Sequence, residues 1–196
     1  PAQKPPHHKN KTRCVGLESV NLPAAECEAW IRFYDATGGP KWTECSNHRF
    51  DPCMCGSHPA TASVVFCDGW TPGVVGHLKH IFLVKNGLEG QIPPDFGSSL
   101  TGLNYLALAG ELLLFKPGVE LLALEPHLGN NLTGKVPPMP FKNYHDDDGE
   151  PNCCLTNPPN VGAVTNRFSC PLPSGASKCK CTDDSGTTHP GVVCSS

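Results

Sequence analysis

Apolar and polar residues alternate in a repeating order through the middle of the chain. Residues 77–93 read HLKHIFLVKNGLEGQIP, with leucine or isoleucine at fixed offsets around an Asn, a Gly and a Pro. Residues 103–108 repeat the first half of this order, and residues 130–137, NNLTGKVP, repeat the second half. The self-similar unit predicts stacked repeats whose short strands point alternate apolar side chains inward. The Asn side chains at 86 and 130 are expected to bond strand-end backbone groups and to stack into a ladder, while Gly and Pro turn the chain back.

A second pattern precedes the repeats and has a helical period. Cys27, Trp30, Ile31 and Tyr34 fall on one face of a helix predicted from Asn21 to Gly39. Pro23 suits the first turn of that helix, and the sequence Gly-Gly-Pro at 38–40 ends it. A β-branched strand is predicted at Ser63–Cys67.

The cysteines gather at the two ends of the chain. None occurs in the 85 residues between the two groups, which are Cys14, Cys27, Cys45, Cys53, Cys55 and Cys67, and Cys153, Cys154, Cys170, Cys179, Cys181 and Cys194. Twelve cysteines in 196 residues predict disulfides and an oxidising compartment. The C-x-C pairs do not have the C-x-x-C spacing of zinc ribbons, so zinc is the weaker reading. We expect each group to pair within itself, and Cys55–Cys67 is the one specific pair predicted.

The second repeat is interrupted. After Leu108 the pattern requires an Asn, but residues 111–129 intervene before Asn130 resumes it. Deleting those residues gives LNYLALAGNNLTGKVPP, an uninterrupted repeat. Two explanations stay open, a retained intron and a genuine loop excursion.

The repeat L-x-x-L-x-L-x-x-N-x-L-x-G-x-I-P resembles that of extracellular leucine-rich-repeat proteins of plants and protists. The stretch FYDATGGPKWTECSNHRFDPCMCG is similar to the N-terminal cap of that class, and NRFSCPLPSGASKCKC to its C-terminal cap. Within the latter, Asn166, Phe168 and Cys170 take the offsets of Asn130, Leu132 and Gly134. The resemblance implies a short leucine-rich-repeat solenoid with a small parallel β-sheet, an irregular convex side, one α-helix in the N-terminal cap and disulfide-stapled caps. It also implies a recognition or structural protein, not an enzyme.

Four segments follow from this organisation. They are a basic, proline-rich arm at 1–19, a cysteine-rich N-terminal cap at 20–76, the repeats with their 111–129 insertion at 77–141, and an acidic loop with a cysteine-rich cap at 142–196.

The residues between the inward leucines of each strand are expected to face the concave surface. In the first repeat they are His80, Phe82 and Val84, with Lys85 following; in the second they are Tyr105, Ala107 and Ala109. Stacking would align His80 with Tyr105, Phe82 with Ala107 and Val84 with Ala109. The resulting apolar stripe is the candidate binding surface. The alternative is that a cap or the N-terminal arm folds over it.

Other chemistry is sparse in the sequence. No nucleophile-elbow, zincin, phosphate-loop or dinucleotide motif occurs, so no catalytic residue, metal site or cofactor is predicted. The run at 145–149, HDDDG, lacks the acids that an EF-hand needs at the flanking positions. A carboxylate pair for glycoside hydrolysis is not excluded by sequence alone. Asn10 and Asn131 begin N-x-S/T sequons, and we expect both to be glycosylated in a secreted chain.

The composition narrows the classes of partner that we expect the chain to bind. A net charge of −3, from 15 basic and 18 acidic residues, argues against nucleic acid. No apolar run approaches the ~20 residues of a membrane span. We therefore expect a secreted or cell-surface, non-enzymatic module that binds an extracellular protein or polysaccharide. The alternative is a structural subunit of a wall or filament, self-associating through contact between the basic residues 1–13 and the acidic residues 145–150.

Overall fold

A computed structural model describes residues 14–16, 19–56, 64–69, 74–109, 129–139, 153–156, 166–182 and 187–195. The helical elements in this part of the chain are α1 (Ala24–Ala36), α2 (Phe96–Ser99) and the 3-10 turns η1 (Gly39–Lys41), η2 (Pro52–Met54) and η4 (Ala176–Lys178). The strands are β1 (Val64–Cys67), β2 (Leu78–Phe82), β3 (Glu89–Gln91), β4 (Tyr105–Ala107), β5 (Asn131–Gly134), β6 (Cys153–Cys154), β7 (Arg167–Ser169), β8 (Lys180–Thr182), β9 (Thr188–Pro190) and β10 (Cys194–Ser195).

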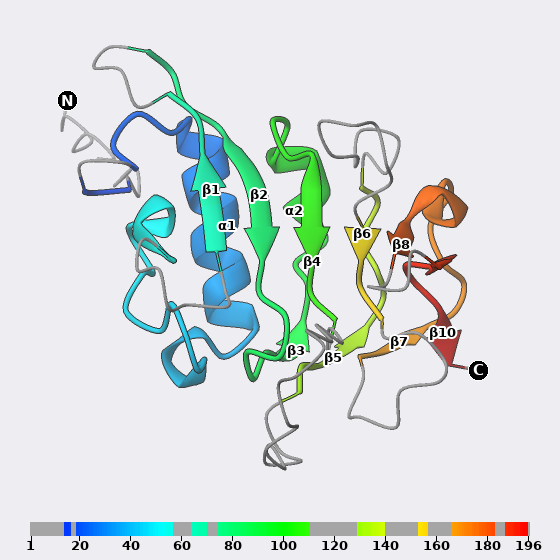
Figure 1. Ribbon diagram of the computed structural model, residues 1–196. Coiled ribbons are helices and arrows are strands. Elements are labelled where there is room, and N and C mark those ends of the chain that lie inside the picture. The colour runs from blue at the N-terminus through cyan, green and yellow to red at the C-terminus, as the bar shows by residue number, and fades with distance from the viewer. Residues whose placement is uncertain are drawn as a thin grey trace, which may run out of the picture.

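The strands form two four-stranded sheets and one ribbon (Figure 1). Sheet A has the order β1-β2-β4-β6; β2, β4 and β6 are parallel, and β1 pairs antiparallel with β2. Sheet B has the order β10-β7-β5-β3 and is parallel throughout. The strands β8 and β9 form an antiparallel ribbon. Sheet B is a correction to the expected irregular convex side, because the short segments after each Asn pair with one another as strands.

The chain passes through both sheets three times. In each pass a strand of sheet A is followed along the chain by an Asn and then by a strand of sheet B. The three sets are β2, Asn86 and β3; β4, Asn130 and β5; and β6, Asn166 and β7. The third pass was not predicted in full. Its register pairs Leu106 with Cys153 and Ala107 with Cys154, so a buried cysteine occupies the position that a leucine or isoleucine fills in the other two passes.

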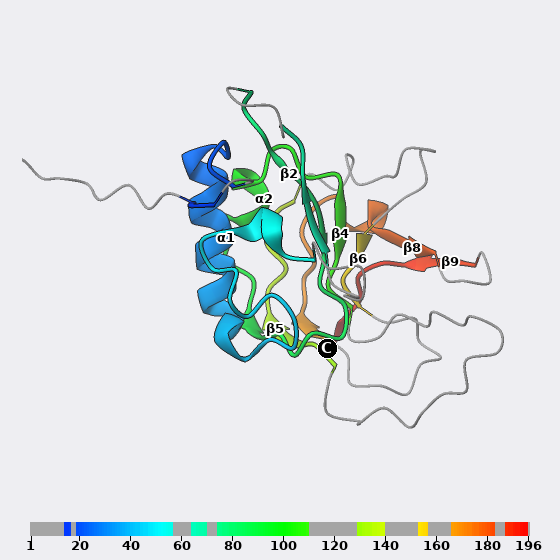
Figure 2. The same cartoon turned by 60° about the vertical axis from the view of Figure 1, so that its left-hand side comes forward.

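The predicted N-terminal helix is confirmed as α1. Its face of Trp30, Phe33 and Tyr34 is buried and packs with the inward residues of sheet A in one apolar core. Gly38, at φ 78°, follows the helix in the left-handed conformation that glycine adopts without a steric penalty. The helix covers one face of sheet A and lies on the side opposite the β8–β9 ribbon (Figure 2). The single turn α2 adds helix beyond the one predicted.

The Asn side chains form the predicted ladder inside the turns. The Oδ1 atom of Asn130 accepts the backbone N–H groups of Asn86 at 2.9 Å and Leu88 at 3.0 Å. Its Nδ2 atom donates to the carbonyls of Leu83, Leu108 and Ala109 at 2.6, 3.0 and 3.1 Å. Asn130 therefore bonds the backbone of its own pass and of the preceding one, and its side chain has no contact with solvent.

The neighbouring passes use the same device. Asn166 accepts the N–H of Leu132 at 2.8 Å and donates to the carbonyls of Leu108 at 2.6 Å and Leu155 at 2.7 Å. At the other end, Asn86 accepts the N–H of Glu44 at 2.7 Å and donates to its carbonyl at 3.1 Å. Burying a backbone N–H or C=O group costs free energy unless the group is hydrogen-bonded. Each Asn side chain supplies these hydrogen bonds at one connection between the sheets.

The interruption of the second pass leaves the ladder intact. Asn130 contacts both Leu108 and Ala109, the last residues described before the insertion. The chain thus leaves and rejoins the repeat at adjacent points. Nearly all of the insertion, with the N-terminal residues 1–13, the sequon residue Asn10 and the acidic run 145–150, lies outside the described residues.

Six disulfides join all twelve cysteines, and each bridge stays within its own half of the chain, as expected. The pairs are Cys14–Cys27, Cys45–Cys55, Cys53–Cys67, Cys153–Cys179, Cys154–Cys181 and Cys170–Cys194. The predicted Cys55–Cys67 pair is wrong. Cys53, on η2, is the cysteine that bonds Cys67 at the end of β1, and Cys55 turns back to Cys45.

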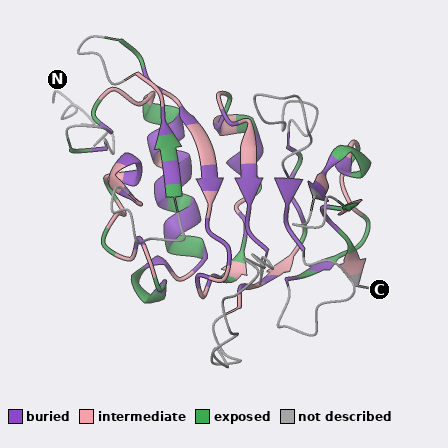
Figure 3. Cartoon of the chain, in the orientation of Figure 1, coloured by how far each residue is buried: buried purple, intermediate pink, exposed green. Residues whose placement is uncertain are grey.

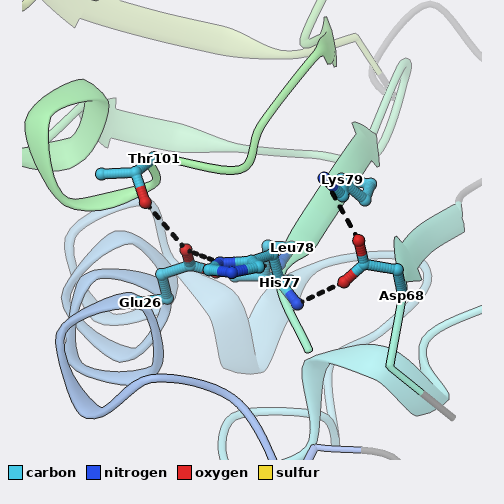
Figure 4. A network of polar contacts seen from close by, with 6 residues as sticks. All are labelled: Glu26, Asp68, His77, Leu78, Lys79 and Thr101. Carbon is cyan, nitrogen blue, oxygen red and sulfur yellow. Dashed lines mark hydrogen bonds and ion pairs between the residues drawn. The ribbon is translucent and has the colours of Figure 1, made fainter. Parts of the chain in front are cut away.

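A buried carboxylate fastens α1 to sheet A (Figure 4). Glu26 is 1% exposed, and its Oε1 atom lies 2.7 Å from Nδ1 of His77 and 3.4 Å from the hydroxyl of Thr101. Its Oε2 atom accepts the N–H of Leu78 at 2.9 Å, at the first residue of β2. One side chain thus joins the helix, the first strand of the repeats and the turn after α2.

A second carboxylate, that of Asp68, contacts the start of β2. Asp68 accepts the N–H of His77 at 2.6 Å and pairs with the Lys79 ammonium at 3.2 Å. Burial alone would raise the pKa of Asp68, but the bond from His77 and the charge of Lys79 outweigh it and hold that pKa below its ordinary value. Because the folded pKa is depressed, the stability that Asp68 contributes is lost as the pH falls through it.

No helix in the described ranges is long and apolar enough to cross a membrane.

Replacing Asn130 by Ala should lower the free energy of unfolding by about 3 kcal/mol, because buried backbone donors and acceptors lose their partners. The adjacent Asn131→Ala is the matched control: Asn131 is half-buried and makes one exposed bond, to Arg167. Its loss should stay under about 1 kcal/mol. Urea unfolding with the disulfides intact measures both, and equal losses would contradict the ladder's role.

Glu26→Ala should cost about 3 kcal/mol, since it strips the buried N–H of Leu78 and the His77 ring of their acceptor. Glu28→Ala, two residues along the same helix, removes only an exposed pair with Arg32 and should cost less than about 0.5 kcal/mol. Thermal and urea melts of the two variants check the difference. A Glu26 variant as stable as the Glu28 variant would show that α1 is held by apolar packing alone.

Candidate functional site

Four aromatic side chains lie together on the face of sheet A that points away from α1. They are Phe66 on β1, His80 and Phe82 on β2, and Tyr105 on β4, called here the aromatic row. Ring centroids are 5.3 Å apart between Phe66 and His80, 5.6 Å between His80 and Tyr105, and 6.0 Å between Phe82 and Tyr105. The rings are tilted by 36° to 49°, so they form a continuous but uneven platform.

Strand register produces this arrangement. The parallel pairing of β2 with β4 sets His80 opposite Tyr105 and Phe82 opposite Ala107, as the repeat spacing predicted. The antiparallel pairing of β1 with β2 sets Phe66 opposite His80 and Val64 opposite Phe82. Successive side chains of a strand point to opposite faces, so Val64 and Phe66 are exposed while Val65 and Cys67 enter the core.

Exposure falls steadily across the sheet from β1 to β6 (Figure 3). Phe66 is 41% exposed and the other three rings are half-buried. Three residues of the predicted stripe are buried instead, namely Val84, Ala107 and Ala109. The expected exposed stripe is therefore confined to His80, Phe82 and Tyr105.

The β8–β9 ribbon explains why Val84, Ala107 and Ala109 are buried. Val84, Ala107 and Ala109 form a small apolar cluster with Cys154 and Cys181, whose disulfide ties β8 to the edge strand β6. In Figure 2 the β8–β9 ribbon stands out on the side of sheet A opposite α1. The aromatic row thus has the ribbon at its β6 side and, among the described strands, ends at the edge strand β1.

Lys85, the remaining residue predicted for this surface, lies at a turn. It is half-buried, has a positive φ of 51°, and donates its N–H to the carbonyl of Ala109 at 3.2 Å. It marks the point where the chain leaves sheet A, beyond the end of β2.

Val64 and Phe66 were not predicted to belong to the surface. The alternation in SVVFC indicated a strand with one exposed face. It did not indicate that this strand pairs antiparallel with β2, because the two strands come from different segments joined by the residues between Cys67 and Leu78.

The aromatic row contains no carboxylate, ammonium or guanidinium group, so it would contact a ligand mainly through its aromatic rings. Its members offer ring faces, ring edges, one imidazole and one phenol hydroxyl. Of the charged residues nearest in sequence, Asp68 and Lys79 pair with each other, and Lys85 lies at the turn beyond β2. Across the described ranges no three His, Cys, Asp or Glu side chains are grouped so as to hold a metal ion.

A groove of about 530 Å³ lies on the other side of the molecule, between α1 and the end of β3. Its two charged residues are already paired: Arg32 with Asp95 at 2.5 Å, and Asp35 with Arg49 at 2.5 Å. The groove therefore presents mostly apolar walls, including Ile92. Nothing in it gathers polar groups toward one point.

The sequon residue Asn131 lies on sheet B. It is half-buried on β5, in register with exposed Glu89 of β3, and its Oδ1 atom accepts a bond from Arg167 at 3.0 Å. A glycan there would stand on sheet B, away from the aromatic row.

Comparison with protein-family models, with curated proteins and with solved structures finds no match to this chain.

Proposed function

We propose that the protein is a secreted, non-enzymatic binding module, built as a short leucine-rich-repeat solenoid with disulfide-stapled caps. Its ligand is an extracellular protein or polysaccharide held on the outer face of sheet A. The observation that carries the proposal is the aromatic row, a partly exposed group of four rings on neighbouring strands of sheet A.

The repeat architecture rests on the three passes. Each contributes one strand to each sheet, and each places an Asn at the turn between them. Stacked units of this kind bury a continuous core and create a surface at which successive strands present their outward residues side by side. The disulfide groups at the two ends would then shield the terminal repeats.

The extracellular location rests on the cysteines. All twelve are bridged, and such bridges persist in oxidising compartments.

Binding is favoured over catalysis by the make-up of the surface. Aromatic side chains on a fixed scaffold give large contact area at little cost in conformational entropy. General acid–base chemistry needs convergent ionisable groups with a positioned proton path. The aromatic row offers ring faces and one imidazole, which suits contact better than proton transfer.

Binding of the intact chain and of its variants to a panel of candidate ligands tests this function. The intact chain should bind at least one member of a panel of purified extracellular polysaccharides and receptor ectodomains, and Phe66→Ala with Tyr105→Ala should weaken that binding about tenfold or more. Phe50→Ala is the matched control, because Phe50 is 40% exposed, against 41% for Phe66, and lies outside the row.

Surface plasmon resonance measures the affinities, and circular dichroism verifies that each variant folds. If every ligand of the intact chain binds the double variant equally well, sheet A is not the binding surface.

A further inference from the structure

We infer, resting on the function proposed above, that the ligand of the aromatic row is a neutral polysaccharide, with two or three of its sugar rings stacked across the strands. Three properties of the row support this inference: its small exposed area, its lack of charged side chains and the arrangement of its rings.

The open part of the row is small. Phe66 exposes 41% of its surface and the other three rings expose less. An aromatic side chain presents about 150–250 Å² in full, so the four together leave roughly 300 Å² or less in contact with solvent. A stable protein partner buries about 800 Å² on each side. The row is therefore too small to be the centre of a protein interface without a large surround, whereas a few sugar rings cover it.

Within the described ranges, the elements beside the row add little exposed surface to it. On the β6 side the face is closed by the apolar cluster around the Cys154–Cys181 disulfide and by the β8–β9 ribbon. On the β1 side the sheet ends at an edge strand. The ribbon therefore limits how far a ligand that lies along the row can extend toward β6.

The absence of charged side chains from the row selects among ligands. Lys79 nearby is paired with Asp68 at 3.2 Å, and Lys85 lies at the turn beyond the end of β2. An acidic polysaccharide or an acidic peptide would need cations that the row itself lacks. A neutral sugar polymer needs apolar faces for its C–H groups, and the ring faces of the aromatic row provide them.

The strand register sets the direction of the ligand. Phe66, His80 and Tyr105 lie opposite one another on β1, β2 and β4, so their rings follow a line perpendicular to the strands. Centroid spacings of 5.3 and 5.6 Å along that line are comparable to the length of one sugar ring in an extended polymer. Phe82 lies to one side of the line, 6.0 Å from Tyr105, and would contact the edge of the ligand.

Affinity electrophoresis of the full chain tests the inference. The gels contain laminarin, xyloglucan or mannan as neutral probes, and polygalacturonate or alginate as anionic ones. At least one neutral polymer should retard the intact chain, and raising the ionic strength should leave that retardation unchanged. Phe66→Ala and Tyr105→Ala should each raise the dissociation constant about tenfold, while Phe66→Tyr, which keeps the ring, and Phe50→Ala should not.

Three results would overturn the inference: no retardation by any neutral polymer, retardation by the anionic polymers alone, or alanine variants that bind like the intact chain. A ligand found instead among the receptor ectodomains and lost in the Phe66 and Tyr105 variants would refute the polysaccharide but leave the binding module standing. If the alanine variants alter binding to no ligand of either class, both fail.

Discussion

Backbone groups are buried where strands of sheet A end and strands of sheet B begin, and the side chains of Asn86, Asn130 and Asn166 are their hydrogen-bond partners. Asn130 alone bonds five backbone groups, from Leu83 to Ala109. A parallel sheet gains its second and third strands only if each crossover returns in the same register, and the ladder enforces that return. The remaining features of the fold build on this repeat.

The aromatic row is one such feature. Its His80–Tyr105 neighbours stand side by side because β2 and β4 are in register, and that register depends on turns secured by Asn86 and Asn130. Phe66 joins them through β1, whose last residue is tied to η2 by the Cys53–Cys67 bridge. A surface on such a scaffold is preorganised, so little ordering entropy opposes a ligand that fits it.

Much of this could be predicted from the sequence where local pattern determines structure. The helix α1, the Asn ladder and the His80–Tyr105 register all follow from spacings within short segments. The third strand of the repeat escaped prediction because Cys153 replaces the leucine that marks the position. The strands of sheet B escaped it as well, since they are two to four residues long. Two of them also contain a glycine, Gly90 in β3 and Gly134 in β5, which weakens the strand signal.

Long-range relations account for the other differences. Six cysteines in one half allow fifteen pairings, so spacing alone could not separate Cys53 from Cys55 as the partner of Cys67. The burial of Ala107 depends on the Cys154–Cys181 bridge, which brings a ribbon from the far end of the chain. The membership of Phe66 in the row depends on an antiparallel pairing that repeat periodicity does not encode.

Hydrogen exchange tests the central role of the ladder most directly. In the intact protein the amides of Asn86, Leu88 and Leu132, which donate to Asn side chains, should be among the slowest to exchange. In Asn130→Ala, protection should collapse at Asn86 and Leu88 and persist at Leu132, whose acceptor is Asn166. Unchanged protection at Leu88 in that variant, or fast exchange of all three amides in the intact protein, would contradict the account.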